Sequence, residues 1–569
     1  MSKNKIRVAA VQFGVGDKVE ENLETSLKMI TNASKCNPSL IVLPEFINHC
    51  SWYENQDHCY SVAVEIDGYF LDEISKKASN YEIFIVVNCT VRREENKVSG
   101  TNILFGPNGN ILAQSDKQVL MGNENNFLKR SETLGPIINT SIGNIGMFSC
   151  MDGVMYETPR CIALRNAQIM CNTLNSFASD EASLHIPVRA AENKVFVIAS
   201  NKSGALVPDF AINDLASKLR IDPDKLNGAG ESQIVDPDGN ILAKAPLEGN
   251  HVIWADIDIK KADFKIRPDN TNIFKSRRPK IYKPIAKKPK RKEKYSNIEN
   301  ISVAVIQPDI SGENFSNDIF NEIKNLSNSS VKLIVLPELF YLSKNEKISN
   351  FNKINIKTKE IISIITKALS NSDTKVVMSV VSNNSTSHEG IMISNLGIIM
   401  RQKQLHICER HKWSTSLSDQ VNVLDLDWGR IGIVVGGDSI YPEVYRLLAL
   451  KDVDIVAVTS KILEDWEIRY GFIERSAENR MALIVASTPS INKTSMIIAP
   501  NKDFTLWTKW ERPFDGSINE PTSTIAENNF GTTIADINPS ASNNRDVTLH
   551  TNVVESRPWK LLDPLIQHN

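Results

Sequence analysis

The chain has 569 residues, of which 41% are hydrophobic and 23% are charged. This length is too great for one ordinary hydrophobic core and predicts at least two globular domains, which excludes a disordered chain. The formal net charge of -2 provides no broad basic field for nucleic acid, and no apolar run reaches the roughly 20 residues that cross a bilayer. The N-terminal segment lacks the apolar core of a signal peptide, so we expect a cytoplasmic protein without nucleic-acid or membrane partners.

Short strands and helices alternate through the first half. Between the first strand and the second, Val19, Leu23, Leu27 and Ile30 fall on one face of a predicted helix. The alternation, together with a hairpin around residues 107–109, predicts an α/β layered fold with mostly buried sheets. In chain order the predicted elements are a strand at 7–13, a helix at 19–33, a strand at 39–44, a helix at 69–79, a strand at 82–91, a hairpin at 101–115, a strand at 142–149 and a helix at 157–167.

Motifs of the first half of the sequence are repeated in the second half. "IRVAAVQ", "LIVLPEF" and "RAAENKVFVIAS" in the first half return in the same order as "ISVAVIQ", "LIVLPEL" and "RSAENRMALIVAS" in the second. Repeats of this size indicate a duplicated domain and not a solenoid. We therefore expect domains at residues 1–284 and 301–569. The lysine-rich stretch 285–300 is predicted to be a solvated linker, which is the usual role of a lone basic run between domains.

Three reactive side chains of the first copy follow predicted strands. Glu45 closes "LIVLPE", Lys117 follows the hairpin, and Cys150 closes "IGMFSC". In open α/β folds ligands bind at the carboxyl ends of strands. With the later "RAAEN" and "GESQIVDPDGNIL" segments, these motifs resemble the nitrilase, or carbon–nitrogen hydrolase, superfamily over nearly the whole of both copies. The resemblance implies two tandem αββα sandwich domains and a Glu-Lys-Cys catalytic triad.

The resemblance also implies a role for each residue. Cys150 is the expected nucleophile, and Glu45 is the base that takes its proton. Lys117 and the backbone N–H of Met151 are expected to stabilise the oxyanion, with Glu124 as a positioning group. A thioester forms and water releases it, so neither a metal nor an organic cofactor is expected.

Two histidine–cysteine pairs follow Glu45. His49-Cys50 and His58-Cys59 could suggest metal ligands, but they lack a recognised zinc spacing. Because they follow Glu45 so closely, His49, Trp52 and Tyr53 are expected to line the substrate pocket instead. The other cysteines of a cytosolic chain are expected to be reduced core residues.

The second copy lacks the nucleophile. Gly436 stands where the first copy has Cys150, while Glu338 is retained and Lys403 is the expected counterpart of the catalytic lysine. Ser439 lies three residues beyond the strand end, so it is not expected to replace the thiol. The second domain is therefore predicted to fold without catalysing.

Family domains pair through the helices near the nucleophile, so residues 441–458 are expected to pack on 156–173 as an intrachain pseudo-dimer. Whether the chain also forms a homo-oligomer stays open.

The segment after the cysteine bears on the substrate. "CMD" is similar to the amidases and carbamoylases of the family, but Gly153 and Val154 stand where carbamoylases often place arginines, which argues against an acidic substrate. The leading hypothesis is an amidase that hydrolyses a small, uncharged or weakly polar amide to acid and ammonia. An N-carbamoyl hydrolase, a nitrilase and a non-catalytic binding protein stay open as alternatives. Arg160 could be an ion-pair partner or a ligand-binding residue, and the role of Glu157 is open too.

Overall fold

The computed structural model describes residues 5–309, 315–342, 351–382 and 386–567. Each half contains two six-stranded sheets, and the strands follow the same spatial order in both halves. In the first half the sheets are β14-β1-β2-β3-β4-β5 and β13-β12-β9-β8-β7-β6. Their bounds are β1 Lys5–Gln12, β2 Leu40–Val42, β3 Phe84–Arg93, β4 Lys97–Phe105, β5 Ile111–Asp116, β6 Ile138–Thr140, β7 Gly143–Ser149, β8 Ile169–Thr173, β9 Phe196–Ser200, β12 Gln233–Val235, β13 Ile241–Lys244 and β14 His251–Asp258, with a small pair β10 Ser203–Ala205 and β11 Asn227–Ala229.

The second half repeats this plan as β19-β18-β17-β16-β15-β26 and β20-β21-β22-β23-β24-β25. The bounds are β15 Ile301–Gln307, β16 Leu333–Val335, β17 Lys375–Val381, β18 His388–Ser394, β19 Gly397–Lys403, β20 Val423–Leu426, β21 Gly429–Val435, β22 Ile455–Thr459, β23 Ala482–Ala486, β24 Met496–Ala499, β25 Thr522–Ile525 and β26 Gly531–Ile537, followed by the pair β27 Asp546–Thr548 and β28 Thr551–Asn552. The inner strands β7, β8 and β9, like β21, β22 and β23, are parallel.

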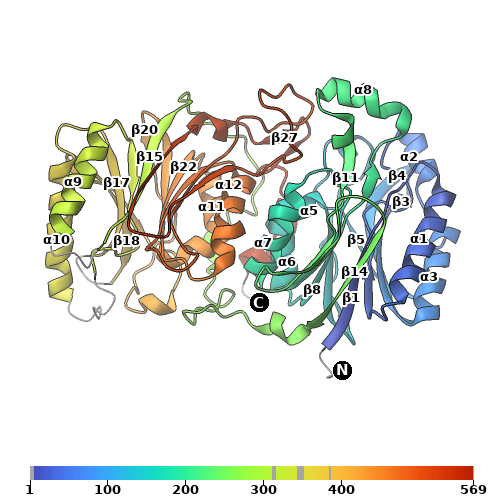
Figure 1. The fold of residues 1–569 in the computed structure, drawn as a ribbon. Coiled ribbons are helices and arrows are strands. Elements are labelled where there is room, and N and C mark those ends of the chain that lie inside the picture. Colours follow the sequence, from blue (N-terminus) through green and yellow to red (C-terminus); the bar gives the residue numbers. More distant parts are fainter. Residues whose placement is uncertain (1–4, 310–314, 343–350, 383–385, 568–569) are drawn as a thin grey trace.

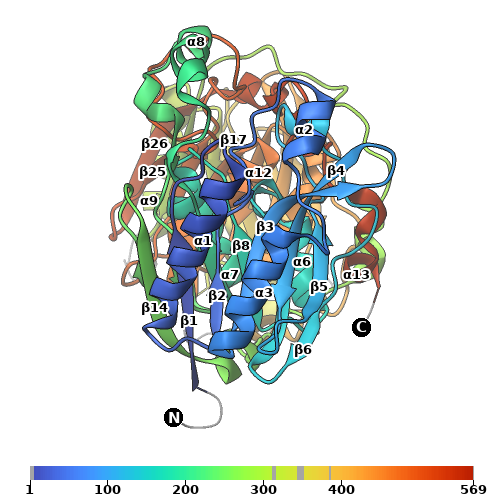
Figure 2. The same ribbon diagram turned by 90° about the vertical axis from the view of Figure 1, so that its right-hand side faces the viewer.

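Helices cover the outer faces of each pair of sheets, and the expected αββα sandwich is confirmed in both halves. Figure 1 shows α9 and α10 at one end of the molecule, α1 and α3 at the other, and α6, α7, α11 and α12 in the middle. Figure 2 shows α1 and α3 lying across the outer sheet of the first half. The helices are α1 Val19–Ser34, α2 Gln56–Val62, α3 Tyr69–Tyr81, α4 Glu124–Phe127, α5 Met151–Val154, α6 Glu157–Leu164, α7 Ile186–Asn193, α8 Asp209–Leu219, α9 Phe315–Asn328, α10 Phe351–Ala368, α11 Pro442–Ala449, α12 Phe472–Asn479 and α13 Asp563–Ile566.

The hydrophobic pattern explains these layers. Leu23 and Ile30 of α1 are buried against the first sheet, with Val19 and Leu27 packed at the edge of the same cluster. Alternate residues of the strands face the other way, so that Val8 and Val42 meet Met147 of the second sheet in a separate core. Burying both faces of both sheets leaves functional side chains only at the strand ends.

The two halves meet through a shared hydrophobic cluster between α6 and α11. Tyr156 and Cys161 pack in the same cluster as Tyr441, Tyr445 and other buried residues of the second half. Figure 1 shows this contact at the centre of the molecule. The cluster makes the two halves one packed body.

Buried ion pairs cross this contact in reciprocal sets. Arg160 Nε lies 3.0 Å from a carboxylate oxygen of Glu443, and the equivalent Arg446 Nε lies 2.7 Å from Glu157. A second set joins Arg189 to Glu478 at 2.9 Å and Arg475 to Glu192 at 2.5 Å. Each contact therefore occurs twice with the roles of the halves exchanged, as in a two-fold interface.

A hairpin from each half also reaches the other half. The β27–β28 hairpin places the Thr551 hydroxyl 3.1 Å from the backbone N–H of Gly122, which donates to it. In the equivalent contact, the hydroxyl of Thr271 in the first half accepts a 3.1 Å hydrogen bond from the N–H of Glu409 in the second half. Both hairpins lie next to the loop that follows the last strand of the facing outer sheet.

The stretch 285–300 between the two domains is partly buried. Lys292 is buried and forms an ion pair with Asp454, and Ser296 is buried as well, which corrects the expectation of a wholly solvated linker. Elsewhere in the segment the lysines are mostly exposed. Across the ranges that the structure describes, no helix has the length and apolar character to span a bilayer.

Candidate active site

Three charged side chains form a buried network at the strand ends of the first half. Glu45 follows β2 and Lys117 follows β5, and the Lys117 ammonium lies 2.9 Å from a carboxylate oxygen of Glu45. The same ammonium lies 2.9 Å from Glu124. Glu124 is held in turn by the backbone N–H of Met121, which donates to it at 2.8 Å. The structure thus brings together three of the side chains that the sequence singled out.

Burial sets the protonation of this network. Loss of solvent raises the pKa of Glu45 to about 7, against the opposing effect of the Lys117 charge. For Lys117 burial alone would lower the pKa, but the carboxylates of Glu124 and Glu45 raise it well above its ordinary value. Lys117 therefore stays a cation, while Glu45 can hold or release a proton near neutral pH.

Cys150 lies at the end of β7 in a strained backbone conformation. Its φ of 44° and ψ of -109° fall in a region that residues with a side chain rarely occupy, and such strain is typical of functional sites. Burial, followed by the charge of Glu45, raises the pKa of the Cys150 thiol well above its ordinary value, and Lys117 opposes this. The resting group is therefore a neutral thiol within the field of both triad partners.

Asp152 fixes the lysine loop to the cysteine loop. Its carboxylate accepts hydrogen bonds from the backbone N–H groups of Gln118 at 3.1 Å, Val119 at 2.7 Å and Ser149 at 3.3 Å. Burial raises the pKa of Asp152 to about 7. These bonds set the position of Lys117 relative to Cys150, a role that the "CMD" motif alone did not reveal.

A cavity of about 70 Å³ opens beside the thiol. Cys150 and Met151 line it, whereas Glu45, Lys117 and Glu124 are not among the residues that line it. Residues of both halves form its wall: Met121, Cys150, Met151, Val154, Asn175, Ser176, Phe177, Ala178, Asp180, Glu181, His185, Ile518, Asn519 and Val547. The site of the first half is therefore completed by the second.

His49 and Trp52 are not among the residues that line this cavity. The His49 ring is buried, and its centroid lies 5.7 Å from that of Tyr53 and 5.6 Å from that of His58. Burial, with the charges of His58 and Lys202, lowers the pKa of His49 to about 4, so its imidazole is neutral. A role for His49 and Trp52 in substrate binding stays a prediction.

Sequence reasoning missed the polar side of the cavity and one buried cation. Glu181 places a carboxylate oxygen 3.9 Å from the Cys150 sulfur, and burial raises its pKa to about 8. Glu181 begins a π-helical turn that leads into α7, a feature often found at functional sites. Lys202 is fully buried near Glu45, and burial lowers its pKa to about 8. For Glu181 the only signal in the sequence was the run Ser179-Asp180-Glu181 after a strand end.

The second half has the same backbone with a different set of side chains. Gly436 has a φ of 53°, close to that of Cys150, and a Cβ there would lie 3.2 Å from the carboxylate of Glu338. The N–H of Gln404 donates to the carbonyl of His388, as that of Lys117 does to Gly100. The counterpart of the lysine is therefore Gln404, and the assignment of Lys403 was wrong.

Glu338 is also committed to other partners. Its carboxylate lies 2.8 Å from a guanidinium nitrogen of Arg410 and 2.9 Å from the ring of His411. Although burial opposes it, these two neighbours lower the pKa of Glu338 well below its ordinary value. A permanently ionised, ion-paired carboxylate cannot act as a base near neutral pH.

Within the described ranges, no group of three histidine, cysteine, aspartate or glutamate side chains is arranged to hold a metal ion. The neighbouring His49 and His58 rings form an aromatic contact instead.

Comparison with known proteins places this geometry in a family. The carbon-nitrogen hydrolase family model matches residues 7–265 and again 302–511. The chain is 27% identical over 288 residues to a probable nitrilase of Schizosaccharomyces pombe, which covers 49% of this chain and 98% of that protein. It is also 27% identical over 294 residues to omega-amidase NIT2 of Bos taurus, which covers 50% of this chain and 98% of that protein.

Among solved structures, an amidase from Nesterenkonia sp. shares 19% identity and a TM-score of 0.38, covering 46% of this chain and 94% of that one. The two curated relatives each match about half of this chain over nearly their whole length, which agrees with the family domain occurring twice. Since the family model covers most of the sequence in two successive regions, this chain belongs to the carbon–nitrogen hydrolase family and is an enzyme that carries the family's domain in tandem.

Proposed function

We propose that this chain is a cysteine-dependent amidase in which only the first half catalyses. Residues 1–284 form the catalytic domain, 285–300 the connection and 301–569 the degenerate domain. The observation that carries the proposal is the buried Glu45–Lys117–Glu124 network beside a thiol at a strained strand end. The relatives named amidase and omega-amidase support an amide as the substrate.

The first step is attack on the amide carbonyl. Glu45 takes the proton from the Cys150 thiol as the sulfur bonds to the carbonyl carbon. The oxygen then gains negative charge, which the Lys117 ammonium and the N–H of Met151 stabilise. Met151 begins α5, and a helix leaves its first N–H groups without intrahelical partners. Glu124 holds the Lys117 ammonium in place.

The second step is release. Glu45 gives its proton to the leaving nitrogen, which departs as ammonia and leaves a thioester on Cys150. Glu45 then takes a proton from water, the water oxygen attacks the thioester carbonyl, and the acid leaves as the thiol is restored. A group that holds and releases protons in turn needs a pKa near the working pH, and that of Glu45 is about 7.

The second half acts as a permanent partner in an intrachain pseudo-dimer. The reciprocal ion pairs between the halves support this arrangement. So does the cavity wall, because Asn519 and Val547 of the second half line the same cavity as Cys150 of the first. Duplication followed by loss of one thiol would preserve the contact and leave one working site.

Ammonia release from short primary amides tests the proposal. The full chain is expected to release ammonia, and Cys150→Ala is expected to reduce kcat by about 10⁴-fold or more, since the nucleophile is gone. Glu45→Gln should lose roughly 10²- to 10⁴-fold, while the matched Glu338→Gln in the second half should keep full activity. Unchanged turnover in Cys150→Ala, with Cys150 no more reactive to iodoacetamide than the other cysteines, would remove the proposal.

A further inference from the structure

The cavity beside Cys150 has a mostly apolar lining, and the buried polar atoms of its lining residues that lack partners are mostly oxygens. Within the part of the chain that the structure describes, buried oxygens of the lining residues Asn175, Asp180, Glu181 and Asn519 have no hydrogen-bond partner, and neither has the Asn519 amide nitrogen. Leaving buried polar atoms unpaired is costly, so such a lining indicates a ligand that brings complementary groups. Against one amide nitrogen stand the oxygens of Asn175, Asp180 and Asn519, and that of Glu181 once its carboxyl group is ionised, which favours a ligand rich in hydrogen-bond donors.

The charged residues of the lining also favour a ligand that donates hydrogen bonds. Among the described residues that line it, Asp180 and Glu181 are the acidic ones, and none is a lysine or an arginine. His185 is its only residue that can carry positive charge, but its ring lies 2.8 Å from Glu474 and 3.7 Å from Asp180. Since this cation is already paired with two carboxylates, a negatively charged ligand would find no uncommitted cation among the described residues of the lining.

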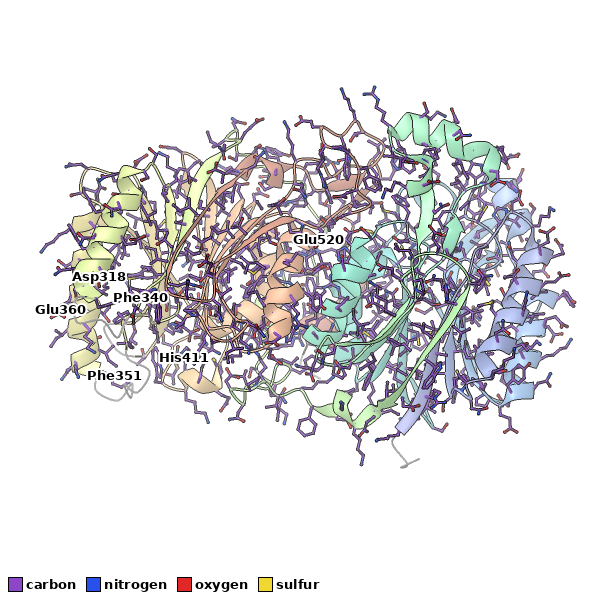
Figure 3. The ribbon with its side chains drawn as sticks, viewed as in Figure 1. Asp318, Phe340, Phe351, Glu360, His411 and Glu520 are labelled. Atoms are coloured by element: carbon purple, nitrogen blue, oxygen red, sulfur yellow. The ribbon has the colours of Figure 1, made fainter. Side chains whose placement is uncertain are left out.

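The second half builds part of this wall through one loop, residues 514–520. The Asn519 N–H donates to Asp180 at 2.5 Å, and the Ser179 N–H donates to the carbonyl of Gly516 at 2.9 Å. Glu520, labelled between the halves in Figure 3, accepts a 3.1 Å hydrogen bond from Ser183. Asn519, with 3% of its surface exposed, is thereby held at the cavity.

The size of the cavity limits the ligand. A volume of about 70 Å³ holds about five water-sized groups, at 10–15 Å³ for each. That is room for a short acyl chain with one polar end, while the amide carbon sits at the sulfur.

We propose, on the basis of the amidase function above, that this cavity selects short amides whose acyl chain ends in an amino group. Asp180 and Glu181 accept hydrogen bonds from the ammonium, and Asn519 of the degenerate half supplies a further acceptor. The second half is then a specificity element and not only a scaffold. When the ammonium binds, its charge favours ionisation of Glu181, so that the empty cavity need not hold two bare carboxylates.

Three amides of matched length, and a fourth that is longer by its carboxylate oxygens, test this selection with the full chain. 3-Aminopropanamide, 3-hydroxypropanamide, butanamide and succinamate differ only at the end of the acyl chain. A charge-assisted hydrogen bond of about 1.5–3 kcal/mol predicts kcat/KM about 10- to 100-fold higher for the amino compound than for butanamide. Succinamate, whose carboxylate meets Asp180, is expected to be the poorest substrate.

Variants of Asn519 assign the effect to the second half. Asn519→Leu should reduce the preference for the amino compound over butanamide, and Asn519→Asp should increase it, because it adds an acceptor with a charge. Glu520→Gln is the matched control, since this neighbour bonds to the first half without lining the cavity. The thermal midpoint and iodoacetamide labelling of Cys150 show that each variant is folded with an intact thiol.

The outcomes separate the two levels of the proposal. Hydrolysis of all four amides at similar kcat/KM, or a preference for succinamate, would overturn the selection and leave the amidase function standing. A preference for succinamate would direct the acyl chain toward buried Lys202 instead. An unchanged preference in both Asn519 variants would remove the second half from the selection. No turnover of any amide, with an unreactive Cys150, would remove both proposals.

Discussion

The strand ends at Cys150 and at Gly436 have nearly the same backbone and opposite chemistry. Both residues have positive φ, at 44° and 53°. In both halves an aspartate two residues later accepts hydrogen bonds from the loop that follows the last outer strand: Asp152 from Val119 at 2.7 Å, and Asp438 from Leu405 at 2.7 Å. The scaffold that positions a nucleophile is therefore complete in a half that has none.

The charge arrangement is what differs. In the first half Glu45 shares one ammonium with Glu124 and has a pKa of about 7. In the second half Glu338 is paired with Arg410 and His411, which lower its pKa well below the ordinary value. Figure 3 labels His411 within the second half. Fold, interface and loop geometry therefore persist in a half without the catalytic side chains, because packing and hydrogen bonds hold them independently of those side chains.

The largest effect is expected from moving the thiol. In a Cys150→Ala chain, adding Gly436→Cys should restore no activity, leaving kcat at least about 10⁴-fold below the original chain. The new thiol would have Gln404 in place of a lysine and an ion-paired glutamate in place of a base. Its Cβ would also lie 2.9 Å from a ring carbon of His388. Ammonia release measures the outcome, and recovered turnover would show that the second site is intact apart from its cysteine.

An intermediate effect is expected from the reciprocal ion pairs. Glu443→Gln leaves the buried Arg160 and Arg277 guanidiniums without their carboxylate, which should lower the free energy of unfolding by about 3–5 kcal/mol. Glu157→Gln should do the same to Arg446. Glu73→Gln, which removes an exposed partner of Lys76, is the control and should change little. Chemical denaturation measures all three, and equal stability throughout would show that the pairs do not hold the halves together.

The smallest effect is a pH dependence confined to the first half. Glu45 must be ionised to accept the thiol proton, and its pKa is raised to about 7. We therefore expect kcat/KM to fall about tenfold for each pH unit below about 7. Glu338→Gln should leave this limb in place, because the Glu338 pKa lies far below that range. An acid limb at the ordinary glutamate value, near 4.3, would contradict a buried base.

Much of this comparison could be predicted from sequence, because strands and the residues at their ends are local features. The motifs "LIVLPE" and "IGMFSC" placed Glu45 and the Cys150 thiol each at the carboxyl end of a strand. The lysine counterpart was missed by one residue: the hairpin of the second half pairs Glu389 with Lys403, which leaves Gln404 at the functional position. The strand end lies 33 residues beyond this position in the first half (150 − 117) and 32 in the second (436 − 404), so one constant offset between the copies misses it by one residue.

The cavity wall could not be predicted in this way. Asn519 lies more than 300 residues from Cys150 in sequence and reaches it only through packing of one half on the other. His49 and Trp52 were expected at the pocket because they follow Glu45 closely. The chain changes direction there, with Phe46 and Ser51 in the left-handed region at φ values of 50° and 52°. Residues that follow Glu45 closely in the sequence therefore need not lie on the same side of the chain as Glu45.

The most direct measurement is the position of the covalent intermediate. The full chain is mixed with a short amide, quenched in acid within the first turnovers, digested and mapped by mass spectrometry. Our expectation is one acyl group per chain, carried by the peptide that contains Cys150 and absent from the Cys150→Ala chain. An acyl group on any residue of the second half, or steady turnover by the Cys150→Ala chain, would contradict it.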